Sequence, residues 1–419
     1  MHLTHRKTCR VCGSSSLTSV IALGHQYLQG SFIKPDKELP PFRKIPLELV
    51  RCNPELDENA CGLLQMAHSV PPEILYSAYW YRSGTNQTMR DHLAEIAETS
   101  QAIIKKENAV VLDIGCNDGT LLKNYPQEFL KYGIDPSDVA SSIKNDFEII
   151  HDLFPSEKLL SKIGKNKFDI VTSIAMFYDL EDPVGFSKSI KSVLADDGIW
   201  VFEMSYMPMM LAMNSYDTIC HEHLEYYSLS VIENILKRAG LRLIRLDINN
   251  INGGSIRCYA THHDFFGYDC DEWMHSISNM RKEEFDLALD TNEPYRDFQE
   301  KIEAHRNELT TLIKELHSKG KKIHIYGAST KGNTILQWCG LDNNLIDYAA
   351  ERNPDKFGAI TLGTHIPIIS EEDSRNMKPD YYLVLPWHFK DEFVLRERHM
   401  LDSGVGFIFP LPSLEIIKN

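Results

Sequence analysis

The segment DTICHEHLEYYSL, residues 217–229, gathers side chains that can move a proton. His221, Glu222 and His223 follow one another, and two tyrosines come shortly after them. A neutral imidazole is a good base near pH 7, and an adjacent carboxylate can orient it or take the proton itself. Two other interpretations stay open: a His-x-His metal site on a strand, and a polar helix end packed on a sheet. We favour catalysis, with His221 or His223 as the base and Glu222 beside it.

A second cluster, YWYRSG, lies upstream and contains Tyr79 and Tyr81. Either phenol can donate a hydrogen bond to a carbonyl oxygen on which negative charge develops. The alternative is that both rings pack at an interface. We predict that Tyr79 and Tyr81 belong to the catalytic site.

A glycine-bracketed turn in VLDIGCNDGTLL, residues 110–121, predicts a cofactor loop. The apolar, β-branched run before it is typical of a buried strand, and the two glycines permit a tight turn and the close approach of a ligand. About 20 residues later, YGIDPS ends a second short strand in an aspartate that can accept hydrogen bonds from two ribose hydroxyls. This spacing favours an adenosyl-binding domain, and the lack of a full GxGxxG disfavours a dinucleotide dehydrogenase. Candidate cofactor-binding residues are Asp113, Gly115, Asn117, Gly119 and Asp135.

Four cysteines near the N-terminus predict a structural zinc site. Cys9 and Cys12 form a C-x-x-C knuckle followed by glycine, and Cys52 and Cys61 supply a more widely spaced second pair. Four thiolates close a tetrahedral site with no open position for chemistry. The alternatives are that only the first pair matters, or that it is redox-active. Residues 13–50 contain few periodic segments, which favours a metal as the stabilising element.

The segment KKIHIYGASTKGNTILQW, residues 321–338, repeats the strand–turn–helix pattern. Gly327 and Gly332 bracket small residues and Lys331, so backbone N–H groups and one ammonium are placed to form an anion cradle. The alternative is a duplicated fold that holds no ligand. The next strand leads into Arg352, a second cation near the same turn.

Short apolar strands alternate with helical segments, which predicts an α/β fold with a mainly parallel sheet covered on both faces. The predicted strands are 110–114, 132–135, 147–154, 168–174 and 198–204, and the clearest predicted helices are 88–105 and 293–320. Ligand groups are expected at the carboxyl ends of the strands. Asp152, after the third strand, is therefore either an acceptor for an adenine amino group or a helix cap. The loop NINGGSIRCY, residues 250–259, either admits a bulky substrate or is a hairpin turn.

Composition narrows the possible partners. A chain of 419 residues, 43% apolar and 25% charged, is ordinary for a globular protein of two or three domains. Its net charge of −15 argues against nucleic acid and against anionic membranes, because both require clustered lysine and arginine. No apolar run reaches the ~18–20 residues of a spanning helix, and the opening residues lack the apolar core of a signal peptide. We expect a cytoplasmic protein whose nine cysteines are thiols or metal ligands.

In this order, the motifs resemble those of the bacterial sugar C-methyltransferases of antibiotic and polysaccharide pathways, the family of the tetronitrose C-3 methyltransferase. CRVCG is similar to the family's zinc module and VLDIGCNDGTLL to its S-adenosylmethionine motif, while HEHLEYYSL, NGGSIRCY and YGASTKGN are similar to its signature blocks. The resemblance covers nearly the whole chain and implies three parts. These are a zinc-binding module at 1–70, a class I methyltransferase Rossmann-like domain at 71–260, and a linker helix with a C-terminal Rossmann-like substrate-binding domain at 261–419.

The resemblance also implies a reaction. S-adenosylmethionine would methylate a ring carbon, with C-3 as the first expectation, of a nucleoside diphosphate 4-keto-deoxysugar through an enolate, and the zinc would be structural. His223 would be the base with Glu222 beside it, and Tyr81 would polarise the keto oxygen. The sugar nucleotide would lie between the two α/β domains with its diphosphate near Lys331 or Arg352. The implied substrate-binding residues are Asn252, Gly253, Lys331, Asn333 and Arg352.

Three departures from the family pattern concern the sugar pocket and the zinc module. Cys220 stands where relatives carry tyrosine, and Phe177 or Tyr178 stands where some carry histidine. Both changes remove polar groups from the pocket, and the second cysteine pair is more widely spaced. They leave the sugar, the methylated carbon and the helper acid open, as are the nucleobase and the oligomeric state. The alternatives are an O- or N-methyltransferase acting on a sugar or small metabolite, a non-catalytic zinc-containing binding protein and, ranked lowest, an oxidoreductase.

Overall fold

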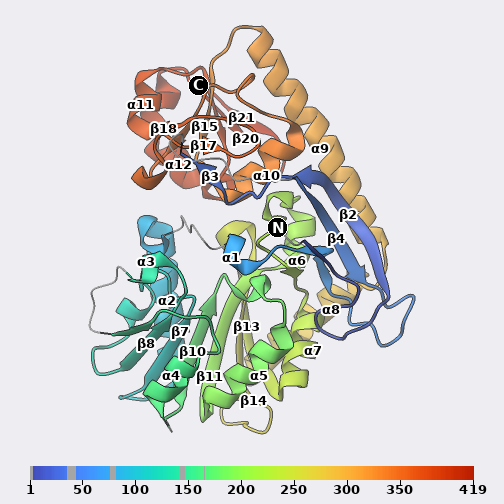
Figure 1. The fold of residues 1–419 in the computed structure, drawn as a ribbon, viewed down its shortest axis with the longest axis vertical. Helices are drawn as coiled ribbons and strands as arrows, with labels where there is room; N and C mark the ends of the chain where they lie inside the picture. The colour runs from blue at the N-terminus through green and yellow to red at the C-terminus, as the bar shows by residue number, and fades with distance from the viewer. Residues whose placement is uncertain (1–2, 35–43, 76–81, 142–146, 165) are drawn as a thin grey trace.

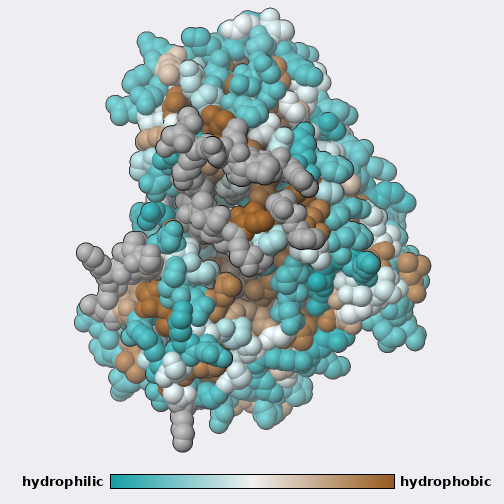
Figure 2. Space-filling model, viewed as in Figure 1, coloured by the Kyte–Doolittle hydropathy of each residue, from teal (hydrophilic) through white to brown (hydrophobic). Residues whose placement is uncertain are grey.

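The computed structural model describes residues 3–34, 44–75, 82–141, 147–164 and 166–419 (Figure 1). An N-terminal module of antiparallel strands is followed by a lobe built on a seven-stranded sheet and by a C-terminal lobe built on a six-stranded sheet. The seven-stranded lobe is at the bottom of Figure 1 and the C-terminal lobe is at the top. The surface in this view is mostly hydrophilic, and apolar side chains reach it in the middle, between the lobes, and on the lower lobe (Figure 2).

The N-terminal module is a four-stranded antiparallel sheet in the order β12-β5-β4-β2. Its strands are β2 (Leu17–Gln26), β4 (Ile45–Cys52), β5 (Leu64–Met66) and β12 (Glu225–Tyr226). Residues 13–50 therefore contain more regular structure than the sequence indicated, because β2 pairs with β4, whose second half, Leu49–Cys52, is buried throughout. Strand β12 comes from the proton-transfer segment, residues 217–229, so the module shares a sheet with that segment. The short strands β1 (Thr4–His5) and β6 (His68–Ser69) pair with each other, and β3 (Phe32–Ile33) pairs with β17 (Ile360–Thr361) of the C-terminal lobe.

The seven-stranded sheet has the order β13-β14-β11-β10-β7-β8-β9. Its strands are β7 (Val110–Ile114), β8 (Leu130–Ile134), β9 (Glu148–Ile150), β10 (Phe168–Ile174), β11 (Leu194–Ser205), β13 (Leu241–Asn249) and β14 (Ser255–His262). Five neighbouring strands of this sheet, β11-β10-β7-β8-β9, are parallel to one another. Strand β14 is antiparallel to both of its neighbours. The predicted strands 110–114 and 168–174 are confirmed residue for residue, since both are apolar runs rich in β-branched residues.

Helices bury both faces of this sheet. Val111 on β7 shares an apolar cluster with Ile96, whereas its neighbour Leu112 shares another with Ile190. Successive side chains of a strand point to opposite faces, so the predicted α/β sheet covered on both sides is confirmed. The helices of this lobe are α1 (Pro72–Leu75), α2 (Gln87–Ile104), α3 (Asp138–Ser141), α4 (Glu157–Ile163), α5 (Pro183–Val193), α6 (Met207–Ala212), α7 (Leu229–Ala239) and α8 (Asp271–Asp286).

The C-terminal lobe repeats the strand–helix alternation around a six-stranded sheet, β18-β16-β15-β19-β20-β21. Its strands are β15 (Ile323–Tyr326), β16 (Tyr348–Glu351), β18 (Ile368–Ser370), β19 (Tyr381–Val384), β20 (Gly406–Phe409) and β21 (Glu415–Ile417). Its helices are α10 (Thr330–Cys339), α11 (Glu371–Asn376), α12 (Lys390–Arg396) and α13 (Arg398–Asp402). All pairs are parallel except β20–β21, so the second predicted Rossmann-like domain is confirmed.

The long helix α9 (Glu293–Ser318) connects the lobes, as its periodicity predicted. Phe298, Ile302 and Leu309 are buried along one face in an apolar cluster that also contains residues of β2, β4 and the C-terminal sheet. In Figure 1, α9 runs beside β2 along one side of the molecule. The N-terminal module and α9 therefore fix the two lobes relative to each other.

One predicted strand is shorter than expected. The segment 147–154 is extended only as far as Ile150, because the side chain of Asp152 organises the turn into α4. The short 3-10 turns are η1 (Ser83–Thr85), η2 (Leu122–Asn124), η3 (Phe177–Asp179), η4 (Tyr216–Thr218), η5 (Ile251–Gly253), η6 (Pro354–Lys356) and η7 (Trp387–Phe389). Within the described ranges, no helix combines the length and apolar character needed to cross a bilayer.

Candidate active site and zinc centre

The four N-terminal cysteines converge on one point. Their Sγ atoms all lie within 4.8 Å of one another, with 3.5 Å between Cys9 and Cys61 and 3.4 Å between Cys12 and Cys52. A tetrahedral zinc with Zn–S bonds of about 2.3 Å separates its sulfur ligands by about 3.8 Å. The cluster fits a four-thiolate structural zinc, and the predicted ligand set is confirmed.

The backbone turns in the same way after the widely spaced second cysteine pair as after the first. Each pair is followed by a glycine with positive φ, Gly13 at 78° and Gly62 at 82°. The residues between Cys52 and Cys61 fold back through backbone turns that begin at Asn53. The extra length is thus taken up in a compact loop, which is why the spacing does not prevent metal binding.

Arg10, between the first two cysteines, connects the zinc centre to the proton-transfer segment. Its buried guanidinium donates to the Met66 carbonyl at 2.9 Å and lies 3.6 Å from the carboxylate of Glu225. The Met66 N–H in turn donates to the Leu224 carbonyl at 2.9 Å. The zinc module therefore holds the chain that follows the two histidines.

The glycine-bracketed turn after β7 has the conformation that its sequence predicts. Gly115 and Gly119 have φ values of 74° and 72°, in the left-handed region that favours glycine. A Cβ on Gly115 would lie 3.4 Å from the side chain of Met176. Both positions therefore favour glycine because of their backbone conformation.

Two buried carboxylates end the neighbouring strands β7 and β8. Asp113 accepts the hydroxyl of Thr172 at 2.6 Å, and burial, with a smaller contribution from the charge of Asp135, raises its pKa to about 7. Asp135 accepts the N–H of Asn117 at 2.9 Å on one oxygen and the N–H of Ser137 at 2.8 Å on the other. Each oxygen keeps a second lone pair for a hydroxyl, so Asp135 fits the ribose role predicted for it.

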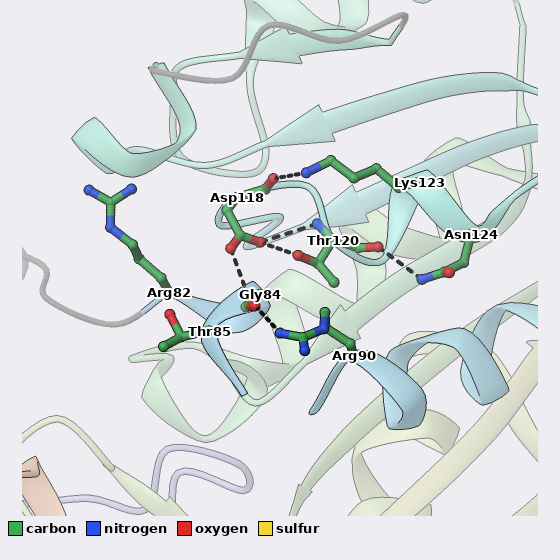
Figure 3. Close-up of a pocket in the computed structure, with 8 residues that line it drawn as sticks. All are labelled: Arg82, Gly84, Thr85, Arg90, Asp118, Thr120, Lys123 and Asn124. Carbon is green, nitrogen blue, oxygen red and sulfur yellow. Dashed lines mark hydrogen bonds between the residues drawn. The ribbon is translucent and has the colours of Figure 1, made fainter. Parts of the chain in front are cut away.

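A pocket of about 450 Å³ opens beside this turn (Figure 3). In its wall, the Asp118 carboxylate accepts the N–H of Gly84 at 2.8 Å and the hydroxyl of Thr120 at 2.6 Å. Next to it, the N–H of Ser83 donates to Asn117 Oδ1 at 3.0 Å. These bonds fasten η1 to the cofactor turn. The lining residues are Arg82, Gly84, Thr85, Arg90, Asp118, Thr120, Lys123 and Asn124.

Asp152 makes the contacts of the helix-cap alternative. Its carboxylate accepts the hydroxyl of Ser156 at 2.8 Å, and Ser156 is the N-cap of α4. The N–H of Leu153 donates to the other oxygen at 2.9 Å. The contact with an adenine amino group stays a prediction.

His223 is held as a neutral base by one backbone hydrogen bond. Its Nδ1 lies 2.8 Å from the carbonyl oxygen of Thr218, which can only accept, so Nδ1 carries the proton. Nε2 keeps its lone pair, and no residue in the described ranges donates a hydrogen bond to it. Burial, reinforced by the charge of Lys331, lowers the pKa of His223 to about 3. An unprotonated ring nitrogen is therefore available at neutral pH.

Glu222 and His221 face the N-terminal module instead. Glu222 accepts the N–H of Gly30 at 3.0 Å, and burial raises the pKa of its carboxyl. His221 is buried and donates from Nδ1 to Gln29 Oε1 at 2.8 Å, and burial lowers its pKa to about 4. A Cβ on Gly30 would collide with the Glu222 carboxylate. The structure thus gives Glu222 and His221 positioning contacts, and their catalytic roles stay predictions.

Aromatic residues form one side of the His223 environment. The Tyr178 ring lies 4.2 Å from the His223 ring, centre to centre, while Phe177 is fully buried against Trp200 and other rings. Cys220 is also fully buried. Tyr178, and not Phe177, is therefore the residue next to the imidazole. Both predicted catalytic tyrosines, Tyr79 and Tyr81, lie outside the described residues.

The NGG loop and the C-terminal lobe meet next to Lys331. The Lys331 ammonium donates to the Asn252 carbonyl at 2.6 Å. Trp387 donates its indole N–H to the Asp217 carboxylate at 2.9 Å, and a Cβ on Gly253 would lie 3.0 Å from the Trp387 ring. The loop is the connection of the β13–β14 hairpin, one of the two forms predicted for it. It brings Asn252 to the C-terminal lobe.

Two predicted substrate ligands make other contacts. Asn333 is buried and donates to the Gln29 carbonyl at 2.6 Å, so it joins α10 to the N-terminal module. Arg352 is exposed, and its guanidinium lies 3.6 Å from Glu371. The structure thus groups Lys331 with Asn252, and gives Asn333 and Arg352 protein partners of their own.

Family comparisons match the chain in three consecutive segments. The descriptions are "Putative zinc binding domain" for residues 9–76, "Methyltransferase domain" for residues 81–246 and "C-methyltransferase C-terminal domain" for residues 250–412. The C-methyltransferase NovU of Streptomyces niveus is 27% identical over 417 residues, which cover 98% of this chain and 96% of NovU. Together these matches show an S-adenosylmethionine-dependent C-methyltransferase.

Solved structures resemble part of this C-methyltransferase. An S-adenosylmethionine-dependent methyltransferase from Clostridium acetobutylicum is 13% identical, with a TM-score of 0.33 over 41% of this chain and 92% of its own. Magnesium protoporphyrin IX methyltransferase from Synechocystis, with bound S-adenosylhomocysteine, is 14% identical, with a TM-score of 0.34 over 44% of this chain and 90% of its own. Each similarity spans less than half of the chain.

Three residues near the candidate site of this C-methyltransferase were not predicted from its sequence: Gln29, Asp217 and His388. Gln29 contacts both His221 and Asn333, and nothing in a lone glutamine signals such a contact. His388 follows a buried strand in LPWHF, so its place after a strand end was a detectable signal. Burial and the charge of Lys331 lower the pKa of His388 to about 3.

Proposed function

We propose that this C-methyltransferase methylates the carbon next to the ketone of a nucleoside diphosphate 4-keto-deoxysugar, with C-3 as the expected position, through an enolate. The observation that carries the proposal is the His223 imidazole, whose Nδ1 proton is held by the Thr218 carbonyl and whose Nε2 receives no hydrogen bond from any described residue. Transfer to carbon needs a carbon nucleophile, and a ketone acidifies the hydrogen on its neighbouring carbon. A neutral imidazole is the matching base.

In the proposed reaction, His223 Nε2 takes the C–H proton, and the electrons of that bond move toward the keto oxygen. The imidazolium is then held in place by its Nδ1–H bond to Thr218. Bound S-adenosylmethionine supplies an electrophilic methyl group on a sulfonium. Asp135, Asp113 and the Gly115–Gly119 turn are the residues proposed to hold this donor. Alignment of two bound substrates contributes a large part of the rate in such a site.

The sugar nucleotide is proposed to lie between the two lobes. Support comes from the meeting of Asn252, Lys331 and Trp387 at the lobe boundary, close to the segment that carries His223. The strand–turn–helix unit of the C-terminal lobe is a common site for nucleotide-containing ligands. The sugar would thus reach the base from the C-terminal side, and the methyl donor would reach it from the other lobe.

The experiment is product analysis with a panel of dTDP- and UDP-linked 4-keto-deoxyhexoses and methyl-labelled S-adenosylmethionine. We expect mass spectrometry and NMR to show one added methyl on C-3. We also expect the C-3 hydrogen to exchange with deuterium from D2O, because the enolate forms before transfer. A methyl ether or methylamine product, or transfer without any C–H exchange in the same panel, would contradict the proposal and favour an O- or N-methyltransferase.

A further inference from the structure

Lys331 projects from the first turn of α10 toward the segment that carries His223. Thr334, three residues later, lies on the same face of the helix and donates its hydroxyl to the Ile219 carbonyl at 2.9 Å. Lys331 must therefore extend along this contact. Its ammonium ends at Asn252, at the boundary between the lobes.

The ammonium has donors to spare. It carries three N–H groups, and the Asn252 carbonyl takes one of them at 2.6 Å. Within the described ranges, Lys331 forms no ion pair, and burial lowers its pKa. Asp217 is the carboxylate whose charge acts on Lys331, and one of its oxygens already accepts the indole N–H of Trp387. A half-buried ammonium, with N–H groups that no described residue accepts beyond the Asn252 carbonyl, is thus placed where the two lobes meet.

The same ammonium acts electrostatically on two imidazoles, those of His223 and His388. Its charge lowers the pKa of His223 and of His388, in each case in addition to burial. It therefore acts on the ring that is proposed to take the substrate proton. A base on one side of a ketone and an ammonium on the other are the two groups that enolate formation needs.

Lys331 fits a single oxygen better than a diphosphate. The N-terminus of α10 is capped by its own Ser329, whose hydroxyl oxygen accepts the Gly332 N–H at 3.0 Å. Arg352, the second predicted diphosphate ligand, is paired with Glu371. Asp217 is buried near Lys331. Its carboxylate balances the charge of the Lys331 ammonium but would repel a diphosphate, which carries several negative charges. The predicted anion cradle is therefore largely satisfied by protein groups.

We propose that Lys331 is a catalytic residue that donates a hydrogen bond to the keto oxygen of the substrate and stabilises the enolate. This inference rests on the proposed function. His223 Nε2 takes the C-3 proton, the C–H pair forms the carbon–carbon double bond, and the carbonyl π pair moves onto the oxygen held by Lys331. The enolate carbon then bonds to the methyl, the carbon–sulfur pair returns to sulfur, the carbonyl re-forms, and His223 releases its proton to solvent.

Lys331→Gln is the deciding variant, because it removes the charge while it keeps an N–H donor on a side chain only one bond shorter. We expect kcat for methyl transfer and the rate of C-3 deuterium exchange to fall together by about 10²–10³-fold. The inhibition constant of dTDP and UDP, which carry the diphosphate but no ketone, should change by less than about threefold. Lys331→Arg should recover part of both rates. Lys321→Gln, which removes a lysine paired with Asp380 at the other end of β15, is the matched control and should leave both rates unchanged.

The possible outcomes distinguish two roles for Lys331, stabilisation of the enolate oxygen and binding of the diphosphate. A tenfold or larger rise in the dTDP or UDP inhibition constant, with kcat at saturating sugar nucleotide near wild type, would overturn the inference in favour of diphosphate binding. Wild-type rates of exchange and transfer in Lys331→Gln would overturn it as well. Binding of S-adenosylmethionine and an unchanged Tm show that the variant is folded. If the wild-type enzyme neither exchanges nor methylates any ketosugar of the panel, the proposed function itself fails.

Discussion

The two glycine-bracketed turns of this molecule, after β7 and after β15, share a fold and differ in charge. Beside the first turn, Asp135 is buried, receives only backbone N–H groups and forms no ion pair with any described residue. At the matching place beside the second turn, Glu351 lies 3.3 Å from Lys356 and accepts the N–H of Asn353 from its own turn. The first carboxylate is prepared for a ligand, and the second is already neutralised.

The difference shows that one strand–turn–helix unit has been adapted to two tasks. A carboxylate with unused lone pairs suits the hydroxyls of a ribose, so the seven-stranded lobe is the one fitted to S-adenosylmethionine. The C-terminal lobe offers Lys331 in place of an acid, which suits an oxygen that gains negative charge. A Rossmann-like pattern identifies a fold, whereas the charges at the strand ends identify the ligand.

The largest effect is expected from His223→Asn, which removes the proposed base. An amide has no basic nitrogen, so kcat for methyl transfer should fall by about 10²–10⁴-fold. Affinity for S-adenosylmethionine, measured by calorimetry, should stay within about threefold, because the proposed donor site lies on other strands. His275→Asn, an exposed histidine of α8, is the control. Residual kcat within tenfold of wild type would remove His223 from the mechanism.

A substitution in the zinc module tests the part of the chain that contacts both lobes. Cys61→Ser should reduce bound zinc, measured by atomic spectrometry, and lower Tm by about 2–5 °C, since ~1 kcal/mol corresponds to roughly 1 °C in a chain of 419 residues. Methyl transfer should fall with it, because β5 of the module pairs with β12 directly after His223. Cys270→Ser, a half-buried cysteine outside the cluster, should change neither zinc content nor Tm. Full zinc content in Cys61→Ser would show that this residue is not a ligand.

Paired substitutions at the two strand ends test the comparison directly. Asp135→Asn should weaken S-adenosylmethionine binding by about 10–100-fold, because hydrogen bonds to a charged acceptor are worth roughly 1.5–3 kcal/mol. Glu351→Gln should leave that affinity unchanged, since its carboxylate is occupied by Lys356. Isothermal titration with S-adenosylmethionine measures both. Equal losses in the two variants would mean that the lobes do not differ in the way proposed.

Local patterns in the sequence were enough to predict much of this fold. Strands β7 and β10 are apolar runs of the right length, and α9 has a regular apolar face, so each is specified by its own residues. The zinc ligands were predicted from the C-x-x-C spacing of Cys9 and Cys12 and from a second, wider cysteine pair, because four thiolates close a tetrahedral site. These features depend on short-range order and on strong residue preferences.

Contacts between distant segments could not be predicted in the same way. The pairing of Glu225 with Gln65 joins strands far apart in the chain, and two-residue strands carry no periodic signal. The contact of Lys331 with the Asn252 carbonyl is made through a backbone oxygen, which every residue has. The sequence therefore predicted that Lys331 lies near an anion, and only the packing of the lobes brings its ammonium to the Asn252 carbonyl.

The smallest predicted effect is on how folding stability changes with pH. One residue from each lobe should contribute to this change, with opposite signs. His388 has a folded-state pKa of about 3, below its ordinary value of 6.5, because it is buried. Between these values the unfolded chain binds more protons, so stability from this group is lost as pH falls from 6.5. Asp113 has a folded-state pKa of about 7, above its ordinary 3.8, so the folded chain binds more protons between 3.8 and 7. From this group, stability is gained as pH falls.

Urea unfolding of the ligand-free enzyme between pH 7 and pH 5 separates the two contributions, each at most about 1.4 kcal/mol per pH unit. His388→Gln should make the loss of stability on acidification shallower, because the proton uptake on unfolding is removed. Asp113→Asn should make it steeper, because the opposing uptake by the folded state is removed. His275→Gln should leave the slope unchanged, since this ring is exposed. If Asp113→Asn flattened the slope instead, the Asp113 carboxyl would be ionised in the folded state near neutral pH. Burial in the seven-stranded lobe would then not raise its pKa.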